Sequence, residues 1–470
     1  MLEKIRQTVT GKHVLILGYG REGRSTMRLL RKAGGYASVA VADQNLVDPS
    51  KEAQGETVEL HTGEHYMEKS LLDSYDVVFK TPGIVLPEPI GSYQCCFVSQ
   101  TGLFIERFRD QIVGITGTKG KSTTSSLLYH ILKENGEDTT LAGNIGIPVF
   151  DIAEDIVPGE IIVLELSCHQ LEHIQVSPHI AVLLNLYEEH LDHYGTMANY
   201  VRAKQNIYAW QKKDDILFCN MEVLPGTVVE GAGEASAAVP CQAEIISAVM
   251  VPEGKEARGI GDIEVAGSAV RYRGSGFHIP EEGISLFGRH NYFDIGVVYG
   301  ICKEFSVTDE KFLRALRTFQ TLPHRLQYLG EREGLRFYDD SISTIGETTI
   351  QALESIKNVD SVLIGGMDRG VDYEQLEGYL TGSSVRHIIL MEETGKRIYH
   401  EIKEKYPTLY ASGRLELVDH LAEAVDLARK VGEEGGACVM SPAAASYGIF
   451  KNFEERGEYF RNCIFGLQKA

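Results

Sequence analysis

The stretch GITGTKGKSTT, residues 114–124, decides the fold of this chain. It joins an apolar, β-branched run that starts at Gln111 (QIVGITG) to a helical pattern that starts at Lys121 (KSTTSSLLYHILKENG). Glycines in such a strand–helix turn let backbone N–H groups surround phosphate oxygens, and the helix N-terminus adds partial positive charge. The Lys121 side chain can reach the β- and γ-phosphates, and the Ser122 hydroxyl can ligate Mg²⁺. The stretch therefore predicts an ATP site in a parallel α/β domain.

The loop does not match the full phosphate-loop pattern GxxxxGK[ST]. Ile115 stands where that pattern has its first glycine, and the glycine falls at Gly117 instead. A GTPase would also need an N-K-x-D run after a suitable strand, which the sequence does not offer. The loop alone leaves kinases, ATPases and ligases open, and a glycine-rich turn without a ligand is the plain structural alternative.

Strand-like runs alternate with helical patterns along most of the chain, which is typical of α/β architecture with parallel sheets. The runs begin at His13, Ser38 and Asp76; at Gln111, Ile161 and Ile180; and at Leu335, Asp360, Arg386 and Ala437. These three series predict three domains: a Rossmann-like domain over residues 1–99, a central phosphate-loop domain over 100–321, and a Rossmann-like domain over 322–470. Residues 224–282 are rich in Gly, Ala and Glu, and we expect irregular strands there.

Composition narrows the class of protein. The formal net charge of −20 disfavours nucleic-acid binding, because such a surface repels a phosphate backbone. No apolar run is long enough to cross a bilayer, and the first residues lack the apolar segment of a signal peptide. The eight cysteines show no C-x-x-C spacing, which argues against a zinc site or a disulfide scaffold. We therefore expect a cytoplasmic protein with reduced thiols and no membrane partner.

A second glycine-rich turn follows the first strand. Gly18-Tyr-Gly20-Arg-Glu-Gly23 opens a helix, and Asp43 ends the next strand, as in a dinucleotide-binding fingerprint. An NAD-dependent oxidoreductase is therefore a rival interpretation, although it leaves the loop at Lys121 unexplained. Backbone amides serve any diphosphate, so this turn cannot by itself distinguish NAD from a UDP-linked ligand.

Landmarks farther along resemble those of the Mur ligase family, in the same order and over essentially the whole chain. They are TGTKGKSTT from Thr116, ELSCHQLE from Glu165, NLYEEHLDHY from Asn185, YVRAK from Tyr200, GRHN from Gly288, LPHR from Leu322, DDS from Asp339 and SPAAASYGIFKNFEERG from Ser441. The last of these is similar to the glutamate-adding members.

The resemblance implies an ATP-dependent amide-forming ligase of peptidoglycan precursor synthesis. ATP would phosphorylate the carboxylate of UDP-N-acetylmuramoyl-L-alanine, and the amine of D-glutamate would attack the acyl phosphate through a tetrahedral intermediate. The central task of such a site is to position the reactants and neutralise negative charge. A monomer is expected, and closure of the last domain would exclude water from the acyl phosphate.

The metal and nucleotide residues follow from the same resemblance. Glu165 ends a buried-looking strand beside the phosphate loop, where it would ligate Mg²⁺ together with Ser122, and the family places His190 at a second Mg²⁺. Lys204 lies on a predicted helix, where a lysine is by default solvated; the resemblance implies instead that CO₂ carbamylates it and that the carbamate positions metal. The expected ATP-binding residues are Gly117, Thr118, Lys119, Gly120, Lys121, Ser122, Thr123, Asn291, Arg325 and Asp340.

The two other substrates are assigned by resemblance as well. The UDP-linked acceptor is expected to contact Gly20, Arg21, Glu22, Asp43, Thr81, Gly83, Asn144 and His190, with Lys80 near the diphosphate. The amino acid is expected to contact Thr344, Arg369, Ser446, Tyr447 and Phe453. The ordinary alternative for each of these residues is a structural hydrogen bond or a solvated loop side chain.

Four positions depart from the family pattern. Ile342 replaces the lysine of D-S-K, Asp294 replaces the last Asn of H-N-x-x-N, Gln327 replaces the Glu of H-R-x-E, and Lys119 replaces a usual Asn. Ile342 leaves L-glutamate or another amino acid open, with Arg369 as the substitute cation. A catalytically silent nucleotide-binding scaffold is the remaining alternative, and the intact Lys121, Glu165 and His190 argue against it.

Overall fold

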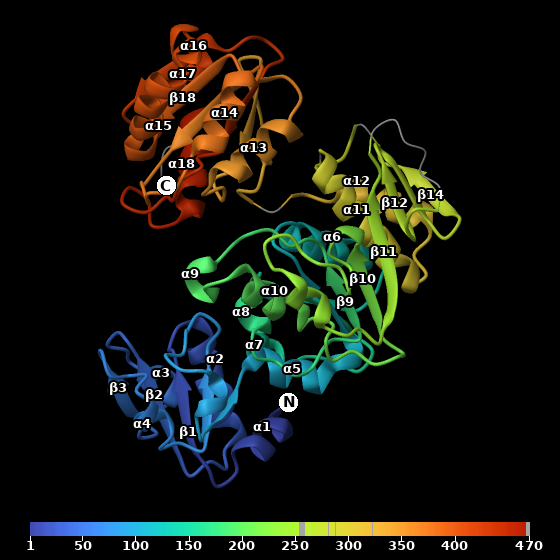
Figure 1. Ribbon diagram of the computed structural model, residues 1–470, viewed down its shortest axis with the longest axis vertical. Helices are drawn as coiled ribbons and strands as arrows, with labels where there is room; N and C mark the ends of the chain where they lie inside the picture. The colour runs from blue at the N-terminus through green and yellow to red at the C-terminus, as the bar shows by residue number, and fades with distance from the viewer. Residues whose placement is uncertain (146, 253–258, 281, 287, 322, 467–470) are drawn as a thin grey trace. The chain divides into compact units, whose positions relative to one another are not determined.

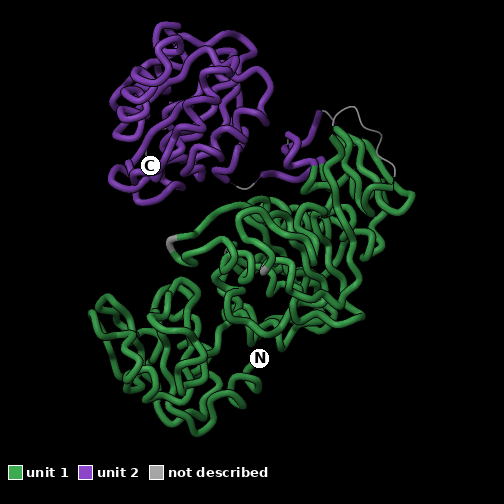
Figure 2. Tube along the Cα trace, viewed as in Figure 1, with its two compact units in different colours: residues 1–279, 293–316 green, residues 280–292, 317–470 purple. Residues whose placement is uncertain are grey.

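A computed structural model describes the chain except for residues 146, 253–258, 281, 287, 322 and 467–470, and for the side chains of residues 192 and 235. The described chain forms two compact units (Figure 2). One contains residues 1–279 and 293–316, and the other contains residues 280–292 and 317–470. Each unit is described by itself below.

The first sheet of the larger unit is parallel throughout, in the order β3-β2-β1-β4-β5. The chain adds β2 and β3 on one side of β1, and then β4 and β5 on the other side. Ligands of open α/β sheets bind beyond the strand ends at the point where the strand order changes direction in this way. The strands are β1 His13–Leu17, β2 Ser38–Asp43, β3 Glu59–Thr62, β4 Val77–Lys80 and β5 Cys96–Val98, with helices α1 Leu2–Val9, α2 Arg21–Ala33, α3 Ser50–Ala53, α4 Lys69–Leu72 and α5 Gln100–Phe108 (Figure 1).

The second sheet of the larger unit has the order β14-β13-β12-β11-β10-β9-β6-β8-β7. Strand β6 lies between β8 and β9, so the loop that follows it reaches the sheet edge beside the ends of both neighbours. The strands are β6 Ile112–Thr116, β7 Thr139–Gly143, β8 Ile161–Glu165, β9 Ile180–Leu183, β10 Ile216–Asn220, β11 Glu244–Met250, β12 Ile263–Ala266, β13 Ala269–Tyr272 and β14 Ser275–His278. The helices are α6 Lys121–Glu134, α7 Val149–Ile152, α8 Cys168–Leu171, α9 Leu191–Tyr194, α10 Met197–Gln205, α11 Arg289–Glu304 and α12 Asp309–Thr318.

The third sheet belongs to the smaller unit and has the order β15-β16-β20-β17-β18-β19. Only the β15–β16 pairing is antiparallel among its described ladders. The strands are β15 Gln327–Arg332, β16 Leu335–Asp339, β17 Val359–Gly365, β18 His387–Met391, β19 Leu415–Val418 and β20 Ala437–Met440, and the helices are α13 Gly346–Ser355, α14 Glu374–Gly382, α15 Glu392–Lys405, α16 Pro407–Ala411, α17 Leu421–Val431 and α18 Phe453–Phe465.

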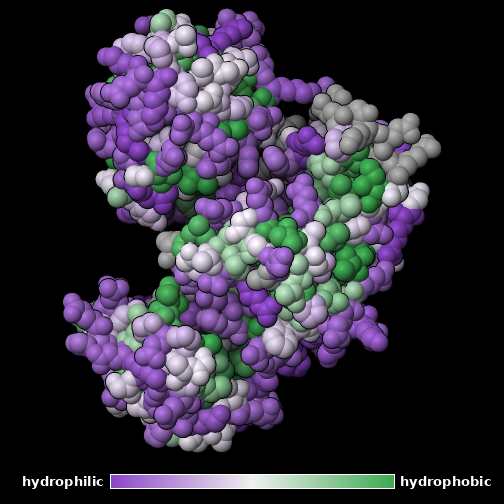
Figure 3. All heavy atoms as spheres, in the orientation of Figure 1, coloured by the Kyte–Doolittle hydropathy of each residue, from purple (hydrophilic) through white to green (hydrophobic). Residues whose placement is uncertain are grey.

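Apolar strand faces explain the three sheets. Strands β1, β4, β6, β8, β9, β17, β18 and β20 are buried along most of their length, as parallel strands covered on both faces must be. Two apolar clusters cover opposite faces of the third sheet, one around Ile364 and Leu390, the other around Leu363 and Met440. Figure 3 shows hydrophilic residues over most of the visible face, with apolar residues scattered among them.

The α/β class with three largely parallel sheets is confirmed, and every strand expected from the sequence is present. The expectation of irregular strands over residues 224–282 is wrong for β11 to β14, which pair in regular ladders. The domain limits at residues 99 and 321 remain predictions, and residue 322, where the last range starts, lies outside the described residues. Within the described part of the chain, no helix is long and apolar enough to span a bilayer.

Candidate functional site

The phosphate loop has the backbone shape that its sequence predicts. Gly120 has φ +83° and precedes α6, and a Cβ there would lie 2.8 Å from the Asp294 carboxylate. A Cβ on Gly117 would lie 2.9 Å from Leu184. Both positions therefore need glycine. The Lys121 Nζ donates to the backbone oxygens of Gly117 and Thr118, each at 2.9 Å, so its ammonium lies over the loop.

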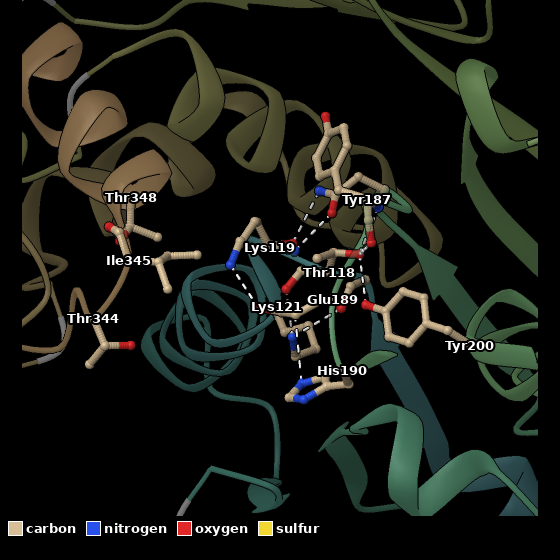
Figure 4. Close-up of polar contacts among 12 residues, drawn as sticks. Thr118, Lys119, Lys121, Tyr187, Glu189, His190, Tyr200, Thr344, Ile345 and Thr348 are labelled. Carbon is tan, nitrogen blue, oxygen red and sulfur yellow. Dashed lines mark hydrogen bonds and ion pairs between the residues drawn. The ribbon is translucent and has the colours of Figure 1, made fainter. Parts of the chain in front are cut away.

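Thr118 joins the loop to two other segments. Its hydroxyl accepts a hydrogen bond from the Tyr187 backbone N–H at 2.9 Å and lies 2.8 Å from the hydroxyl of buried Tyr200 (Figure 4). Tyr187 follows β9, and Tyr200 lies in α10. Thr118 thus fixes the loop, the β9 end and α10 against one another, although the sequence suggested only an ATP contact.

Glu165 ends β8, directly beside β6, as the sequence predicts. Its Oε1 accepts a 2.7 Å hydrogen bond from the Asn144 amide, while its buried Oε2 has no hydrogen-bond partner. A buried carboxylate oxygen without a donor favours a cation nearby. Asn144 thus orients Glu165, and its expected contact with the UDP-linked substrate stays a prediction. Gly146 of the same segment lies outside the described residues.

Lys204 is buried, so the default expectation of a solvated helix lysine is wrong. Its Nζ donates to the Gly117 oxygen at 2.7 Å and lies over the Tyr200 ring, 5.1 Å from the centroid. Burial, and then the charge of Lys121, lower the pKa of Lys204 to about 7. An amine with that pKa is substantially neutral at neutral pH, which is the form that reacts with CO₂.

His190 precedes α9 with a left-handed backbone, φ +57°. Its imidazole is partly exposed, and Nε2 lies 3.8 Å from a carboxylate oxygen of Glu189. The ring of His169 approaches it edge-on at 4.9 Å between centroids, and the ring of His193 lies 4.4 Å from that of His169. Sequence reasoning missed His169, although it lies only four residues after Glu165.

The donor types near the loop fit magnesium. Ser122 offers a hydroxyl in the first turn of α6, and Glu165 offers a buried oxygen that no protein donor uses. Oxygen donors of this kind suit Mg²⁺, and His190 would be the less typical ligand. Among the described residues, no three or more His, Cys, Asp or Glu side chains are already gathered as a metal cluster. Thr123 is buried in the first turn of α6, and its contact with ATP stays a prediction.

The N-terminal turn is tight where β1 and β4 end side by side. Gly18 has φ +90°, and a Cβ there would lie 2.1 Å from the Thr81 hydroxyl oxygen. A Cβ on Gly23 would lie 2.1 Å from the Gly18 oxygen. Asp43 ends β2 and accepts from the backbone N–H of Tyr19 at 2.7 Å, so its carboxylate braces this turn.

The other residues expected to contact the UDP-linked acceptor differ in their burial and in their partners. Glu22 receives a 3.2 Å hydrogen bond from Gln170, and burial raises the pKa of Glu22. Lys80 is buried 3.8 Å from Glu172, and burial lowers the pKa of Lys80. Gly20 is the N-cap of α2 and Arg21 is its first residue, while Thr81 and Gly83 follow β4. The contact of Glu22 with Gln170 holds α2 to α8 and gives Glu22 a structural partner.

The smaller unit brings several predicted residues to the ends of β16, β17 and β20. Asp340 accepts from the Ser441 hydroxyl at 2.7 Å and from the Leu326 N–H at 3.1 Å. Burial raises the pKa of Asp340 to about 6, and Arg325 opposes that rise. Asp340 is therefore a structural tie between the chain segments after β16 and β20, besides its predicted ATP contact. Asn291 lies partly buried in the first turn of α11.

Two of the predicted amino-acid residues touch. The Arg369 guanidinium donates to the Thr344 backbone oxygen at 3.1 Å, and Arg369 is exposed, so other guanidinium N–H groups face solvent. Ser446 is buried and Tyr447 is exposed, both in the segment after β20. Phe453 begins α18, with its ring 6.1 Å from that of His324.

Sequence reasoning missed Arg456. This buried arginine donates from Nη2 to the backbone oxygens of Ser341 and Ala444, at 2.8 and 2.9 Å. It thereby joins the segments that carry Thr344 and Ser446. Its position one turn after Phe453, within the closing sequence landmark, was the available signal.

Comparison with known proteins agrees with this architecture. The Mur ligase middle domain profile matches residues 115–235. A UDP-N-acetylmuramoylalanine–D-glutamate ligase of Geobacillus kaustophilus is 34% identical over 97% of this chain and 98% of its own length. One from Ligilactobacillus salivarius is 32% identical over 99% and 97%.

Solved structures show the same fold. The MurF ligase of Thermotoga maritima in complex with ADP aligns with a TM-score of 0.57 and 17% identity over 98% of this chain and 96% of its own. A pseudomurein peptide ligase type C of Methanothermus fervidus aligns with a TM-score of 0.56 and 16% identity over 97% and 100%. With relatives above 30% identity over nearly their entire length, the chain belongs to the Mur ligase family.

Proposed function

We propose that this protein is an ATP-dependent ligase that adds D-glutamate to UDP-N-acetylmuramoyl-L-alanine in the cytoplasm, as a monomer, during peptidoglycan precursor synthesis. The observation that carries the proposal is the meeting of Lys121 and Lys204 on one backbone oxygen, that of Gly117 in the phosphate loop. A nucleotide-binding loop that adjoins a buried lysine of lowered pKa suits a ligase better than a simple phosphate-binding turn.

The chemistry needs an activated acceptor. A carboxylate oxygen of the acceptor would attack the γ-phosphorus of ATP, which releases ADP and forms an acyl phosphate. The glutamate amine would then add to the acyl carbon, and the tetrahedral intermediate would expel phosphate and lose a proton to give the amide. Lys121 and the N–H groups at the start of α6 would hold the phosphates in line for the first step.

Magnesium bound by Ser122, Glu165 and His190 would neutralise phosphate charge. Asn144 would keep Glu165 in one orientation through its 2.7 Å hydrogen bond, so that the second carboxylate oxygen stays available. A carbamate on Lys204 would convert a cation beside Lys121 into an anion. This change would remove the repulsion by Lys121, which, after burial, lowers the pKa of Lys204.

The amino acid would bind in the smaller unit. Arg369 and Thr344 would hold a glutamate carboxylate, with Ser446, Tyr447 and Phe453 in the neighbouring segment. L-glutamate is the second candidate, because Ile342 offers no ammonium group where D-S-K would place one. NAD is not favoured, because an oxidoreductase would leave the phosphate loop at Lys121 and the amino-acid residues of the smaller unit unexplained.

The test is a ligase assay with purified protein, ATP, Mg²⁺, UDP-N-acetylmuramoyl-L-alanine and either enantiomer of glutamate. We expect ADP, phosphate and a product heavier by one glutamate residue, with D-glutamate preferred. A preference for L-glutamate would replace the amino-acid assignment and keep the ligase. No product with either enantiomer would overturn the proposal.

A further inference from the structure

Lys119 lies in the middle of the phosphate loop, and its side chain extends toward the carboxylate of Glu189. Asn185 holds its backbone on both sides: the Lys119 N–H donates to the Asn185 Oδ1 at 2.8 Å, and the Asn185 amide donates to the Lys119 oxygen at 3.1 Å. The side chain then places Nζ 2.8 Å from the Glu189 Oε1 (Figure 4). Both side chains are mostly buried, with 29% and 27% of their surface exposed, so water screens the pair only in part.

Glu189 lies at the centre of the site's charges. One of its carboxylate oxygens lies 2.8 Å from the Lys119 Nζ, and the other lies 3.8 Å from the His190 Nε2. A second carboxylate, that of Asp294, lies against Gly120 of the same loop. An unneutralised carboxylate at this place would repel a triphosphate that occupies the loop.

We propose that Lys119 is a positioning residue: it neutralises Glu189 and holds the segment before His190, and it strengthens ATP binding through that carboxylate rather than by a direct phosphate contact. The inference rests only on the nucleotide site of the proposed function. It explains how the phosphate loop accommodates the charged Lys119 side chain. The positive charge of Lys119 is paired with the negative charge of Glu189, which lies in the segment after β9.

The test is a double-mutant cycle on ATP binding, measured by calorimetry with Mg²⁺ and without the other substrates. Lys119→Met should weaken ATP binding about tenfold, because Glu189 is left unneutralised near the phosphates. Glu189→Gln alone should change it less than about threefold. The double variant Lys119→Met/Glu189→Gln should return to within about threefold of the unmodified protein.

Lys133→Met is the matched control, since that exposed lysine lies at the far end of α6 and bonds only Tyr129 among the described contacts. It should leave binding unchanged. Lys119→Arg, which keeps the charge, should bind ATP normally and guards against a folding defect in Lys119→Met.

A double variant as weak as Lys119→Met would overturn the inference, because it would mean that Lys119 contacts the nucleotide itself. Unchanged binding in Lys119→Met would overturn it as well. Failure of the proposed function gives a different pattern: the cycle would hold while no glutamate is added to the acceptor.

Discussion

Lys204 is the single residue whose environment bears most directly on the chemistry. Its ammonium is buried against Gly117, and its pKa is lowered to about 7. We expect Lys204→Ala to lower kcat on the order of 100-fold, because a charge that positions the reacting groups is lost. Short-chain carboxylates added to this variant should restore part of the rate by taking the place of a carbamate. Full activity of Lys204→Ala would contradict both expectations.

Arg369 is the residue on which amino-acid binding is expected to depend. Because Ile342 supplies no cation, Arg369→Ala should raise KM for glutamate about 100-fold with a smaller change in kcat. Ile342→Lys in the Arg369→Ala background should recover part of that loss. Steady-state kinetics with both enantiomers measure the effect, and Arg386→Ala, at an exposed arginine before β18, is the control. An unchanged KM in Arg369→Ala would remove Arg369 from the site.

Residue types were easier to predict than residue contacts. Lys121 and Glu165 were identified because a motif and a strand end mark them. The burial of Lys204 was also available: in α10, Met197, Tyr200, Val201 and Lys204 recur at helical spacing, so the lysine lies on the buried stripe. The Asn144–Glu165 contact was not available, because it depends on β7 lying next to β8 in the sheet.

At the scale of elements, the tight turns between strands and helices determine how these elements pack. Gly23→Ala should destabilise the larger unit by about 1–3 kcal/mol, since its Cβ would meet the Gly18 oxygen at 2.1 Å. Gly20→Ala is the matched control, with φ −73° and no atom within 4 Å of the added Cβ. Urea unfolding measures both. Equal midpoints for the two variants would contradict the packing described for this turn.

A second element-scale prediction concerns α14 and α15. The buried carboxylate of Glu377 has no hydrogen-bond partner, and burial, followed by the charge of Glu401, raises its pKa to about 7 from 4.5. The ionised form is therefore disfavoured in the folded chain, and stability falls as pH rises from about 4.5 through about 7.

Glu377→Gln should remove that loss. At pH 8 the variant should be more stable by on the order of 1 kcal/mol, because Lys405 and water offset part of the cost, and at pH 4.5 the two proteins should be alike. Thermal unfolding across this pH range measures the difference. A variant that is less stable at pH 8 would mean that the pairing with Lys405 outweighs burial.

The strands that the sequence predicted are mainly the apolar, buried ones. The buried strands β6, β8 and β17 were clear because continuous β-branched runs mark them. Strands β3, β5, β7, β15 and β19 were missed, since partly exposed edge strands mix polar and apolar residues. Strand β10 was missed as well, although it is a buried interior strand. The regular pairing of β11 to β14 was hidden by the Gly-rich connections between them.

At the scale of the whole molecule, the order of landmarks carried more information than any one of them. The turn at Gly18 fits NAD or UDP equally, and the loop at Gly114 fits many nucleotide enzymes. Their succession, followed by the closing segment from Ser441, predicted the family that full-length relatives then showed. Strand order and the contacts between segments needed the structure, because they depend on long-range packing.

The central claim is that ATP held at Lys121 is spent on the acceptor's carboxylate. The most direct measurement uses UDP-N-acetylmuramoyl-L-alanine labelled with ¹⁸O in that carboxylate, with mass analysis of the phosphate released during ligation. Because the acyl phosphate leaves with a carboxylate oxygen, we predict one ¹⁸O atom in each phosphate that accompanies product. Unlabelled phosphate, or label in AMP with release of pyrophosphate, would contradict the account.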